Sequence, residues 1–306
     1  MIVVVAPGQG SQTPGFLAPW LELPGARERL EQLGAIAGHD LVAHGTLSDA
    51  DTIRDTAVAQ PLIVAAGLVT LDALGAAGLA DRIGGIAGHS VGEITAAAGA
   101  GILTDEDAIA LVAERGRAMA EAAALEPTGM AAVLGGEPDE VVAALEASGL
   151  TPANVNGGGQ IVAAGARDAL AALAEAPPAG TRVIPLQVAG AFHTRYMAPA
   201  VDRLRAAADS VVATDPRIPI WTNRDGTAVA SGPGFVDLVV GQVANPVRWD
   251  LVQASLAEAG VTGIVELAPA GTLVGLARRA LKGVPAVAVK TPDDLDAVRA
   301  MIDGEA

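Results

Sequence analysis

Short apolar runs alternate with longer stretches of helical periodicity along most of the chain. Five runs have the length of buried strands, and they lie at 2–6, 83–87, 219–222, 264–267 and 286–290. Eight stretches have a helical pattern, and they lie at 27–37, 58–74, 91–100, 104–123, 235–243, 248–259, 272–282 and 293–302. Continuous apolar runs are typical of buried strands, and strands that alternate with helices indicate a mostly parallel sheet. We therefore predict an α/β fold.

The middle of the chain follows a different pattern. Strands are predicted at 130–134, 153–156, 161–164 and 182–188, with helices at 138–148 and 167–176. The resulting β-α-β-β-α-β order is that of a ferredoxin-like unit. We expect a ferredoxin-like subdomain at 129–189, inserted into a large α/β catalytic domain made of 1–128 and 190–306.

Composition restricts the kinds of protein that this chain can be. The 306 residues are 51% hydrophobic but only 2% aromatic, so the core must be built from small aliphatic side chains. A net charge of −16 argues against nucleic acid and anionic membrane surfaces as partners. The chain contains no cysteine, which excludes disulfides, thiolate metal sites and a cysteine nucleophile, and we expect no bound metal.

Nothing in the sequence indicates a membrane segment or an export signal. No apolar run approaches the ~20 residues of a transmembrane helix. The apolar run at 1–6 is short and has no basic flank, unlike a signal peptide. We therefore expect a cytoplasmic protein.

The clearest chemical motif is Gly88-His89-Ser90-Val91-Gly92, which lies between an apolar strand and a helix. This G-x-S-x-G pattern is that of a nucleophile elbow, in which glycines allow a tight turn with close backbone neighbours. The elbow holds a serine hydroxyl at a helix N-terminus, where negative charge is favoured. It supplies a nucleophile and part of an oxyanion hole together, and it makes the large domain α/β-hydrolase-like. The alternative is an ordinary glycine-rich turn without a catalytic serine.

A second glycine-rich segment, PGQGSQ at 7–12, follows the first strand. It lacks both G-x-G-x-x-G and the G-K-[ST] of a P-loop, so a phosphate site is not indicated. The segment either offers the backbone N–H of Gln9 to a ligand or is a plain turn.

Two arginines of the helix at 104–123 lie on different faces. Arg115 shares its face with apolar residues three and four positions away, whereas Arg117 shares its face with Glu114 and Glu121. We expect Arg117 to form solvated ion pairs. A buried arginine needs an anionic partner, which for Arg115 is either a protein carboxylate or a substrate carboxylate held bidentately.

The chain has four histidines, of which one is a candidate general base. His39 and His44 flank a loop without other catalytic residue types, so we expect them at the surface. His89 directly precedes Ser90, and the chain direction makes it a poor base for that serine. His193 lies at a strand-to-helix junction directly after the small subdomain and is the candidate that remains.

Five motifs occur together in one order along the chain. They are PGQGSQ at 7–12, GHSVGE at 88–93, ERGR at 114–117, GAFH at 190–193 and QVANPVRW at 242–249. In order and spacing the chain resembles malonyl-CoA:acyl carrier protein transacylases and the related acyltransferase domains of polyketide synthases. The resemblance spans nearly the whole chain, and an inserted ferredoxin-like domain also belongs to that family.

The resemblance implies a role for each of the main candidates. Ser90 would be the acylated nucleophile and His193 its general base. Arg115 would grip the free carboxylate of the malonyl group. The small Thr194 after Ala-Phe-His is more similar to the malonyl-selective members than to those that select branched acyl groups.

Three further positions gain roles from the same resemblance. The backbone N–H groups of Gln9 and Val91 would form the oxyanion hole. In this family a backbone carbonyl, rather than an aspartate, orients the histidine, and Gln242 occupies the matching position. The catalytic group is therefore expected to be a Ser-His dyad.

The implied reaction transfers malonyl from malonyl-CoA to the phosphopantetheine thiol of an acyl carrier protein. It would pass through a malonyl-serine intermediate in a ping-pong cycle and supply extender units for fatty acid or polyketide synthesis. No metal or redox cofactor is needed, because the coenzyme A thioester is itself the substrate. Free-standing members of the family are usually monomers, so we expect a monomer.

A carrier protein is typically acidic, as this chain is, so docking requires local cations. The candidates are Arg117, Arg195, Arg278, Arg279 and Lys282. Solvated surface residues without a partner are the alternative for each of them.

Three other functions are compatible with parts of this pattern. A serine hydrolase would share the elbow, but it has no need for Arg115, for the 7–12 loop or for an inserted subdomain. A binding module that has kept the fold but lost catalysis does not explain why Ser90, His193 and Arg115 are all present. Methylmalonyl or another extender unit as the substrate stays open.

Overall fold

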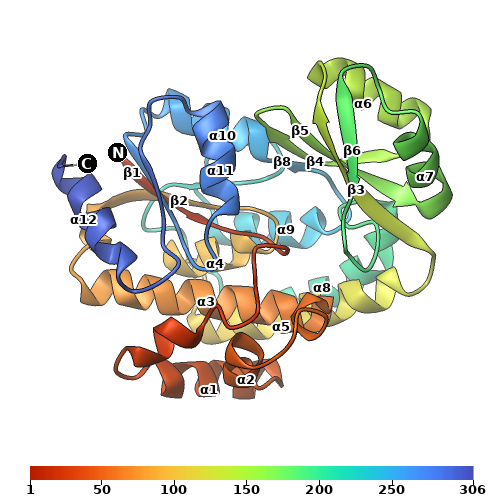
Figure 1. Cartoon of the computed structure of the whole chain (residues 1–306). Coiled ribbons are helices and arrows are strands. Elements are labelled where there is room, and N and C mark those ends of the chain that lie inside the picture. Colours follow the sequence, from red (N-terminus) through yellow and green to blue (C-terminus); the bar gives the residue numbers. More distant parts are fainter. Residues whose placement is uncertain (306) are drawn as a thin grey trace.

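The computed structural model describes residues 1–305 and contains two five-stranded sheets. Sheet A is parallel throughout, in the order β10-β9-β1-β2-β7. Its strands are β1 (Ile2–Ala6), β2 (Ile83–Gly88), β7 (Ile220–Trp221), β9 (Gly263–Glu266) and β10 (Ala286–Ala288). Helices lie on both faces of this sheet (Figure 1). The predicted α/β fold with a mostly parallel sheet is confirmed.

Both faces of sheet A are buried, because the side chains of a strand alternate between its two faces. In β1, Val3 and Val5 belong to one apolar cluster, and Val4 and Ala6 belong to another. The first cluster includes side chains of α10 (Trp249–Glu258) and α11 (Thr272–Ala280). The second includes side chains of α1 (Ala26–Ala37), α2 (Leu41–Thr46), α3 (Thr56–Ala76), α4 (Gly92–Gly99), α5 (Asp105–Ala123), α8 (Ala198–Ala208), α9 (Gly232–Gln242) and α12 (Asp294–Asp303).

Short 3-10 turns and side-chain caps at helix starts complete this part of the fold. The turns are η1 (Ala18–Glu22), η2 (Thr52–Arg54), η3 (Ala80–Arg82) and η4 (Arg195–Met197). The Thr104 hydroxyl accepts a hydrogen bond of 3.1 Å from the backbone N–H of Asp107. This cap satisfies one free N–H of the first turn, so α5 begins where the sequence predicts.

Sheet B is mixed and is formed mainly by the middle of the chain. Its order is β6-β3-β5-β4-β8, and its pairs are antiparallel except for β4 with β8. Its strands are β3 (Thr128–Gly135), β4 (Thr151–Gly157), β5 (Gln160–Ala166), β6 (Thr181–Pro185) and β8 (Val247–Arg248). One face packs against α6 (Pro138–Ala147) and α7 (Arg167–Glu175). The elements from β3 to β6 follow the order predicted for 129–189.

Three segments differ from the sequence predictions. Residues 41–46 form α2 rather than a loop, and the Asp40 side chain accepts a hydrogen bond from the Ala43 N–H to cap it. Helix α8 was not predicted, because it buries only Ala200, Leu204 and Ala208 and so has a narrow apolar stripe. Residues 247 and 248 pair with β4 before α10 begins, so the fifth strand of sheet B comes from outside the predicted subdomain.

Helix α3 corrects the expectation that no apolar run approaches membrane-spanning length. It has 21 residues and is apolar enough, by length and composition alone, to cross a membrane. However, 78% of its most apolar window is buried inside the protein. The helix lies beneath sheet A, against α4 and α5 (Figure 1). We therefore interpret α3 as a helix of the protein core.

The turn between β2 and α4 has no room for side chains at its two flanking glycines. A Cβ on Gly88 would lie 2.0 Å from the carbonyl carbon of Gly92. A Cβ on Gly92 would lie 2.2 Å from the carbonyl oxygen of Ala6, which is part of β1. Both contacts are with backbone, so no side-chain movement could relieve them. The turn can therefore be this tight only with glycine.

We predict that Gly92→Ala lowers the stability of the protein by about 2 kcal/mol or more, because β1 or α4 must move. Gly275→Ala is the matched control, since it lies within α11 and a Cβ there would meet nothing within 4 Å. Alanine is the better helix former, so this variant should gain about 0.5–1 kcal/mol. Urea unfolding of both variants measures the difference. Equal stability of the two variants would contradict this account of the turn.

Candidate active site

A cavity of about 640 Å³ lies at the carboxyl ends of the strands of sheet A. One wall contains Gln9, from the loop after β1, and Ser90, from the turn after β2. The opposite wall contains Met130, Asn154 and Val162, from the face of sheet B that α6 and α7 do not cover. Ligands of open parallel sheets bind at this end of the strands.

Ser90 and His193 meet in this cavity although 103 positions separate them in the sequence. The Ser90 Oγ lies 2.7 Å from the His193 Nε2. Both residues have left-handed backbones, with φ of 53° and 60°, and within residues 1–305 no other non-glycine residue has a positive φ. Such strain is typical of functional sites, because the surrounding structure must hold it in place.

The tautomer of His193 follows from its second contact. Its Nδ1 lies 2.9 Å from the backbone carbonyl oxygen of Gln242, which can only accept a hydrogen bond. Nδ1 therefore carries the proton, and the free lone pair of Nε2 faces Ser90. Burial, and secondarily the charge of Arg115, lower the pKa of His193 to about 3. The ring is thus neutral near pH 7 and can accept the proton of the serine hydroxyl.

Arg115 reaches the same cavity from α5 and is only 1% exposed. Its Nη1 donates to the Gln60 Oε1 at 2.7 Å, and its Nη2 donates to the Gln242 Oε1 at 2.8 Å. The same Nη2 lies 3.5 Å from the Ser90 Oγ. Its Nε has no partner within the described residues. Burial lowers the pKa of Arg115 to about 10, so the group is still a cation near pH 7.

The contacts of Arg115 answer part of the question that the sequence left open. Among the described residues no carboxylate forms an ion pair with it, and amide oxygens hold it instead. Two neutral amides compensate the positive charge only in part. The cavity is therefore suited to receiving an anion beside Ser90.

The loop after β1 and the start of α4 supply free backbone donors. Neither the N–H of Gln9 nor that of Val91 has an acceptor within residues 1–305. Both residues line the cavity. The Gln9 side chain donates to the Arg54 carbonyl and to the Thr56 hydroxyl, each at 3.3 Å, which holds the loop in place. These N–H groups are available to an oxyanion formed at Ser90.

Two residues of the site, Glu93 and Asn223, were missed by the sequence analysis. The Asn223 Oδ1 accepts a hydrogen bond of 2.7 Å from the Ser90 N–H, and its Nδ2 donates to the Gly88 carbonyl at 2.7 Å. Glu93 is buried and accepts from the Asn223 N–H at 2.6 Å. Glu93 ends the GHSVGE motif and could have been noticed there, but a glutamate in a first helical turn is ordinarily explained by the helix dipole.

Within residues 1–305 the rings of the other histidines form no hydrogen bond with the Ser90 hydroxyl. The His89 Nε2 lies 2.8 Å from the Asn156 Oδ1, and its ring packs edge-on against Trp249. Burial lowers the pKa of His89. His39, in the α1–α2 connection, and His44, within α2, pack against each other and are half-buried.

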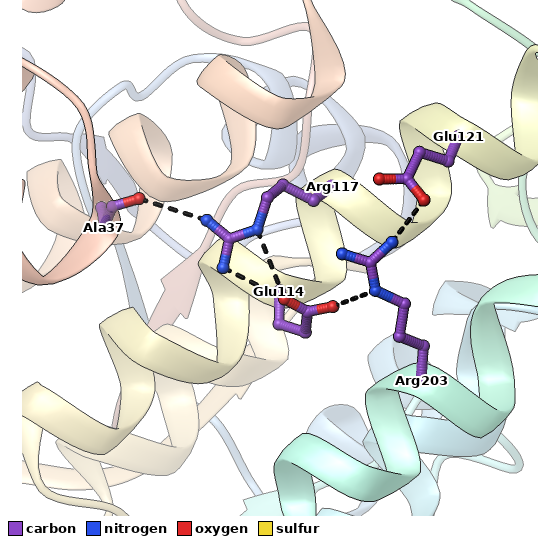
Figure 2. Close-up of polar contacts among 5 residues, drawn as sticks. All are labelled: Ala37, Glu114, Arg117, Glu121 and Arg203. Carbon is purple, nitrogen blue, oxygen red and sulfur yellow. Dashed lines mark hydrogen bonds and ion pairs between the residues drawn. The ribbon is translucent and has the colours of Figure 1, made fainter.

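Arg117 is held in an ion-pair cluster on α5 (Figure 2). It is not among the residues that line the cavity. Its Nη2 lies 3.1 Å from the Glu114 Oε2, and its Nη1 lies 3.5 Å from the Ala37 carbonyl oxygen. Glu121 pairs with Arg203 of α8 instead of Arg117, and Arg203 also pairs with Glu114. The cluster ties α5 to α8 and to the end of α1.

The remaining candidate docking cations lie on the surface. Arg278, Arg279 and Lys282 are exposed at and just after the end of α11, whose first turns line the cavity. The Arg279 Nε donates to the Gly158 carbonyl at 3.1 Å, across to sheet B. Arg195 is exposed and lies over the Tyr196 ring.

Comparison with known proteins gives consistent matches over nearly the whole chain. A model of the acyl transferase domain matches residues 3–295. The malonyl CoA-acyl carrier protein transacylase of Mycobacterium tuberculosis is 54% identical over 297 residues, which cover 97% of this chain and 98% of the relative.

Solved structures agree with this match. A crystal structure of MCAT from Mycobacterium tuberculosis superposes with a TM-score of 0.95 at 53% identity, covering 97% of this chain and 99% of that one. A type II polyketide synthase acyl-carrier protein in complex with its malonyl-transacylase gives a TM-score of 0.92 at 29% identity, with 99% of both chains covered.

We predict that the reactivity of Ser90 changes little between pH 7.5 and 5.5, because a His193 with a pKa of about 3 stays neutral. A histidine with the usual pKa would be protonated over this range, and the rate would fall about tenfold. The measurement is the rate constant for labelling by a fluorophosphonate, with Ser90→Ala as the unreactive control. A tenfold loss with a midpoint near pH 6.5 would refute the neutral, buried base.

Proposed function

Because the chain belongs to the acyltransferase family of malonyl CoA-acyl carrier protein transacylases, we propose that it transfers malonyl from malonyl-CoA to acyl carrier protein. The acceptor is the phosphopantetheine thiol of the carrier, and the product serves fatty acid or polyketide synthesis. The observation that carries this proposal is the position of the Arg115 Nη2, 3.5 Å from the Oγ of a serine that is itself 2.7 Å from a neutral histidine.

In the first half-reaction Ser90 attacks the thioester carbonyl of malonyl-CoA. The hydroxyl proton moves to the His193 Nε2 as the Oγ–carbon bond forms, and the N–H groups of Gln9 and Val91 stabilise the oxyanion. The carbon–sulfur bond then breaks, and His193 returns the proton to the departing coenzyme A thiolate. A malonyl-serine ester remains.

The second half-reaction reverses these steps with a different thiol. The phosphopantetheine thiol gives its proton to His193 and attacks the ester, and the Ser90 oxygen leaves and takes the proton back. A thioester is exchanged for a thioester, so the cycle is nearly thermoneutral and needs neither a metal nor a redox cofactor. The Gln242 carbonyl keeps His193 in one tautomer throughout.

Arg115 supplies the selectivity of this mechanism. A malonyl group carries a carboxylate that can pair with the buried guanidinium and so compensate for the water that the guanidinium has lost. An acetyl group has no carboxylate and cannot form this pair. A serine hydrolase with the same elbow has no use for such a cation. The same argument does not separate malonyl from methylmalonyl, because both carry the carboxylate.

The carrier protein is expected to dock on cations near the cavity mouth. Arg278, Arg279 and Lys282 are exposed at and just after the end of the helix that lines the cavity. Arg195 is exposed two residues after His193, whereas Arg117 is engaged by Glu114 and is the weakest candidate. A carrier protein in complex with its malonyl-transacylase is among the structural relatives, which supports docking on this fold.

We also propose a division of the chain and a finer description of the fold. Residues 129–189 form a ferredoxin-like subdomain, supported by the element order from β3 to β6 and by their own apolar cluster. The segments 1–128 and 190–306 form an α/β-hydrolase-like catalytic domain, supported by the turn that carries Ser90. We propose a monomer that acts in the cytoplasm, with α3 buried in its core.

We predict that wild-type protein mixed with malonyl-CoA gains the mass of one malonyl group on Ser90 and that Ser90→Ala gains none. Intact-protein mass spectrometry followed by peptide mapping measures both. A malonyl adduct retained by Ser90→Ala would exclude Ser90 as the nucleophile.

We predict that Arg115→Ala reduces kcat/KM for malonyl-CoA by about 100-fold or more, since hydrogen bonds to charged groups contribute about 1.5–3 kcal/mol each. The rate with acetyl-CoA should change much less, because acetyl makes no such contact. Transfer assays with both thioesters measure the ratio. Equal losses for the two substrates would remove the carboxylate-binding role from Arg115.

A further inference from the structure

Glu93 is a buried carboxylate that the mechanism above does not use. It is 1% exposed and lies on α4, three residues after Ser90. Its Oε1 accepts the Asn223 N–H at 2.6 Å, and its Oε2 accepts a hydrogen bond from the Gln242 Nε2. Glu93 therefore contacts both the residue that holds the Ser90 N–H and the residue that holds Arg115.

The Gln242 amide lies between two groups of opposite hydrogen-bonding character. On one side Arg115 offers only donors, and on the other side an ionised Glu93 offers only acceptors. The amide satisfies both in one orientation only, with its Oε1 toward the guanidinium and its Nε2 toward the carboxylate. In that orientation its Nε2 also donates to the Asn223 Oδ1 at 3.0 Å. The position of the Arg115 Nη2 thus depends on a residue that it does not touch.

We propose that Glu93 is a positioning residue that, together with the Asn223 Oδ1, fixes the polarity of the Gln242 amide and thereby aims Arg115 at the space beside Ser90. Its consequence for selectivity rests on the proposed function, because the ligand that Arg115 would receive is the malonyl carboxylate. Glu93 itself touches neither the substrate nor the reacting atoms in this mechanism.

Glu93→Gln isolates this role from the support of Ser90. The new Oε1 can still accept the Asn223 N–H, so the contact that supports the turn is kept. The new Nε2 then faces the Gln242 Nε2, donor against donor. If the Gln242 amide rotates to avoid this conflict, its Nε2 faces the Arg115 Nη2 and its Oε1 faces the Asn223 Oδ1. Neither orientation of the amide is therefore free of a mismatch.

The assay pH must keep Glu93 ionised in the wild type. Burial raises the pKa of Glu93 to about 8, against the lowering effects of the Asn223 N–H, the Arg115 charge and the Thr222 hydroxyl. Among the neighbouring titratable groups, Arg115 has a pKa of about 10 and His193 of about 3. At pH 9 Glu93 is therefore mostly ionised while Arg115 is still mostly a cation.

The experiment measures transfer from malonyl-CoA and acetyl-CoA at pH 9, together with fluorophosphonate labelling of Ser90. We expect Glu93→Gln to raise KM for malonyl-CoA at least about tenfold, while kcat/KM for acetyl-CoA and the labelling rate stay within about threefold. Gln242→Met, which removes the amide but keeps the backbone carbonyl, should also lower the malonyl-to-acetyl ratio of kcat/KM, and this second variant tests the proposal even if Glu93→Gln does not fold.

Glu266→Gln is the matched control for neutralising a buried glutamate. Glu266 is fully buried and accepts N–H groups of Gly271, Leu273 and Val274 at 2.8–2.9 Å, so it also serves as a buried acceptor. We expect this variant to be less stable to heat but to keep the malonyl-to-acetyl ratio of the wild type.

Two results would overturn the proposal: an unchanged malonyl-to-acetyl ratio in Glu93→Gln, or equal losses of malonyl transfer, acetyl transfer and Ser90 labelling. If the wild type takes no malonyl group at all, the proposed function fails separately. A crystal structure of Glu93→Gln then still decides the positioning role, since an unchanged contact between Arg115 and Gln242 would contradict it.

Discussion

The site depends on a buried guanidinium that no carboxylate contacts directly. Arg115 is 1% exposed and is held by the amide oxygens of Gln60 and Gln242. Removing a cation from water is costly unless an anion compensates it, and neutral amides do so only partly. The positive charge of Arg115 is therefore only partly compensated, and an anion that binds beside Ser90 would compensate it further. This buried cation distinguishes the cavity from the active site of a serine hydrolase, which has no need for it.

The fold supplies the rigidity that such an arrangement requires. Ser90 directly follows β2 of sheet A, and His193 lies in the segment after β6 of sheet B. The two sheets therefore fix the distance between Ser90 and His193. Both residues have a positive φ. The backbone N–H of Ser90 donates to the Asn223 side chain, and the backbone N–H of His193 donates to the Val243 carbonyl. The second sheet also forms the opposite wall of the cavity.

Much of this could be predicted from the sequence, because the signals are local. The strands β1 and β2 are continuous apolar runs, and the turn at Ser90 is marked by glycines that tolerate no Cβ. Helices with narrow apolar stripes, such as α8, gave no such signal. The strand β8 has two residues and gains its partner only when the chain folds back onto β4.

The network around Glu93 could not be predicted for a related reason. It joins Glu93 of α4 to Asn223 and Gln242, which lie 130 and 149 positions further along the chain. Sequence periodicity places Arg115 on the apolar face of its helix, but it does not tell which polar groups from other elements meet it there. The sequence left open whether the partner of Arg115 is a carboxylate of the protein or of a substrate. Only the structure shows that amide oxygens hold the guanidinium.

The most direct test of the account is a two-stage experiment on the wild-type protein. Malonyl-CoA is added first, excess thioester is removed, and holo acyl carrier protein is then added while the mass of both proteins is followed. The account predicts that a malonyl adduct forms and then moves to the carrier protein in equal amount. Steady release of coenzyme A with no adduct, unaffected by the carrier protein, would mean that water is the acceptor and would contradict it.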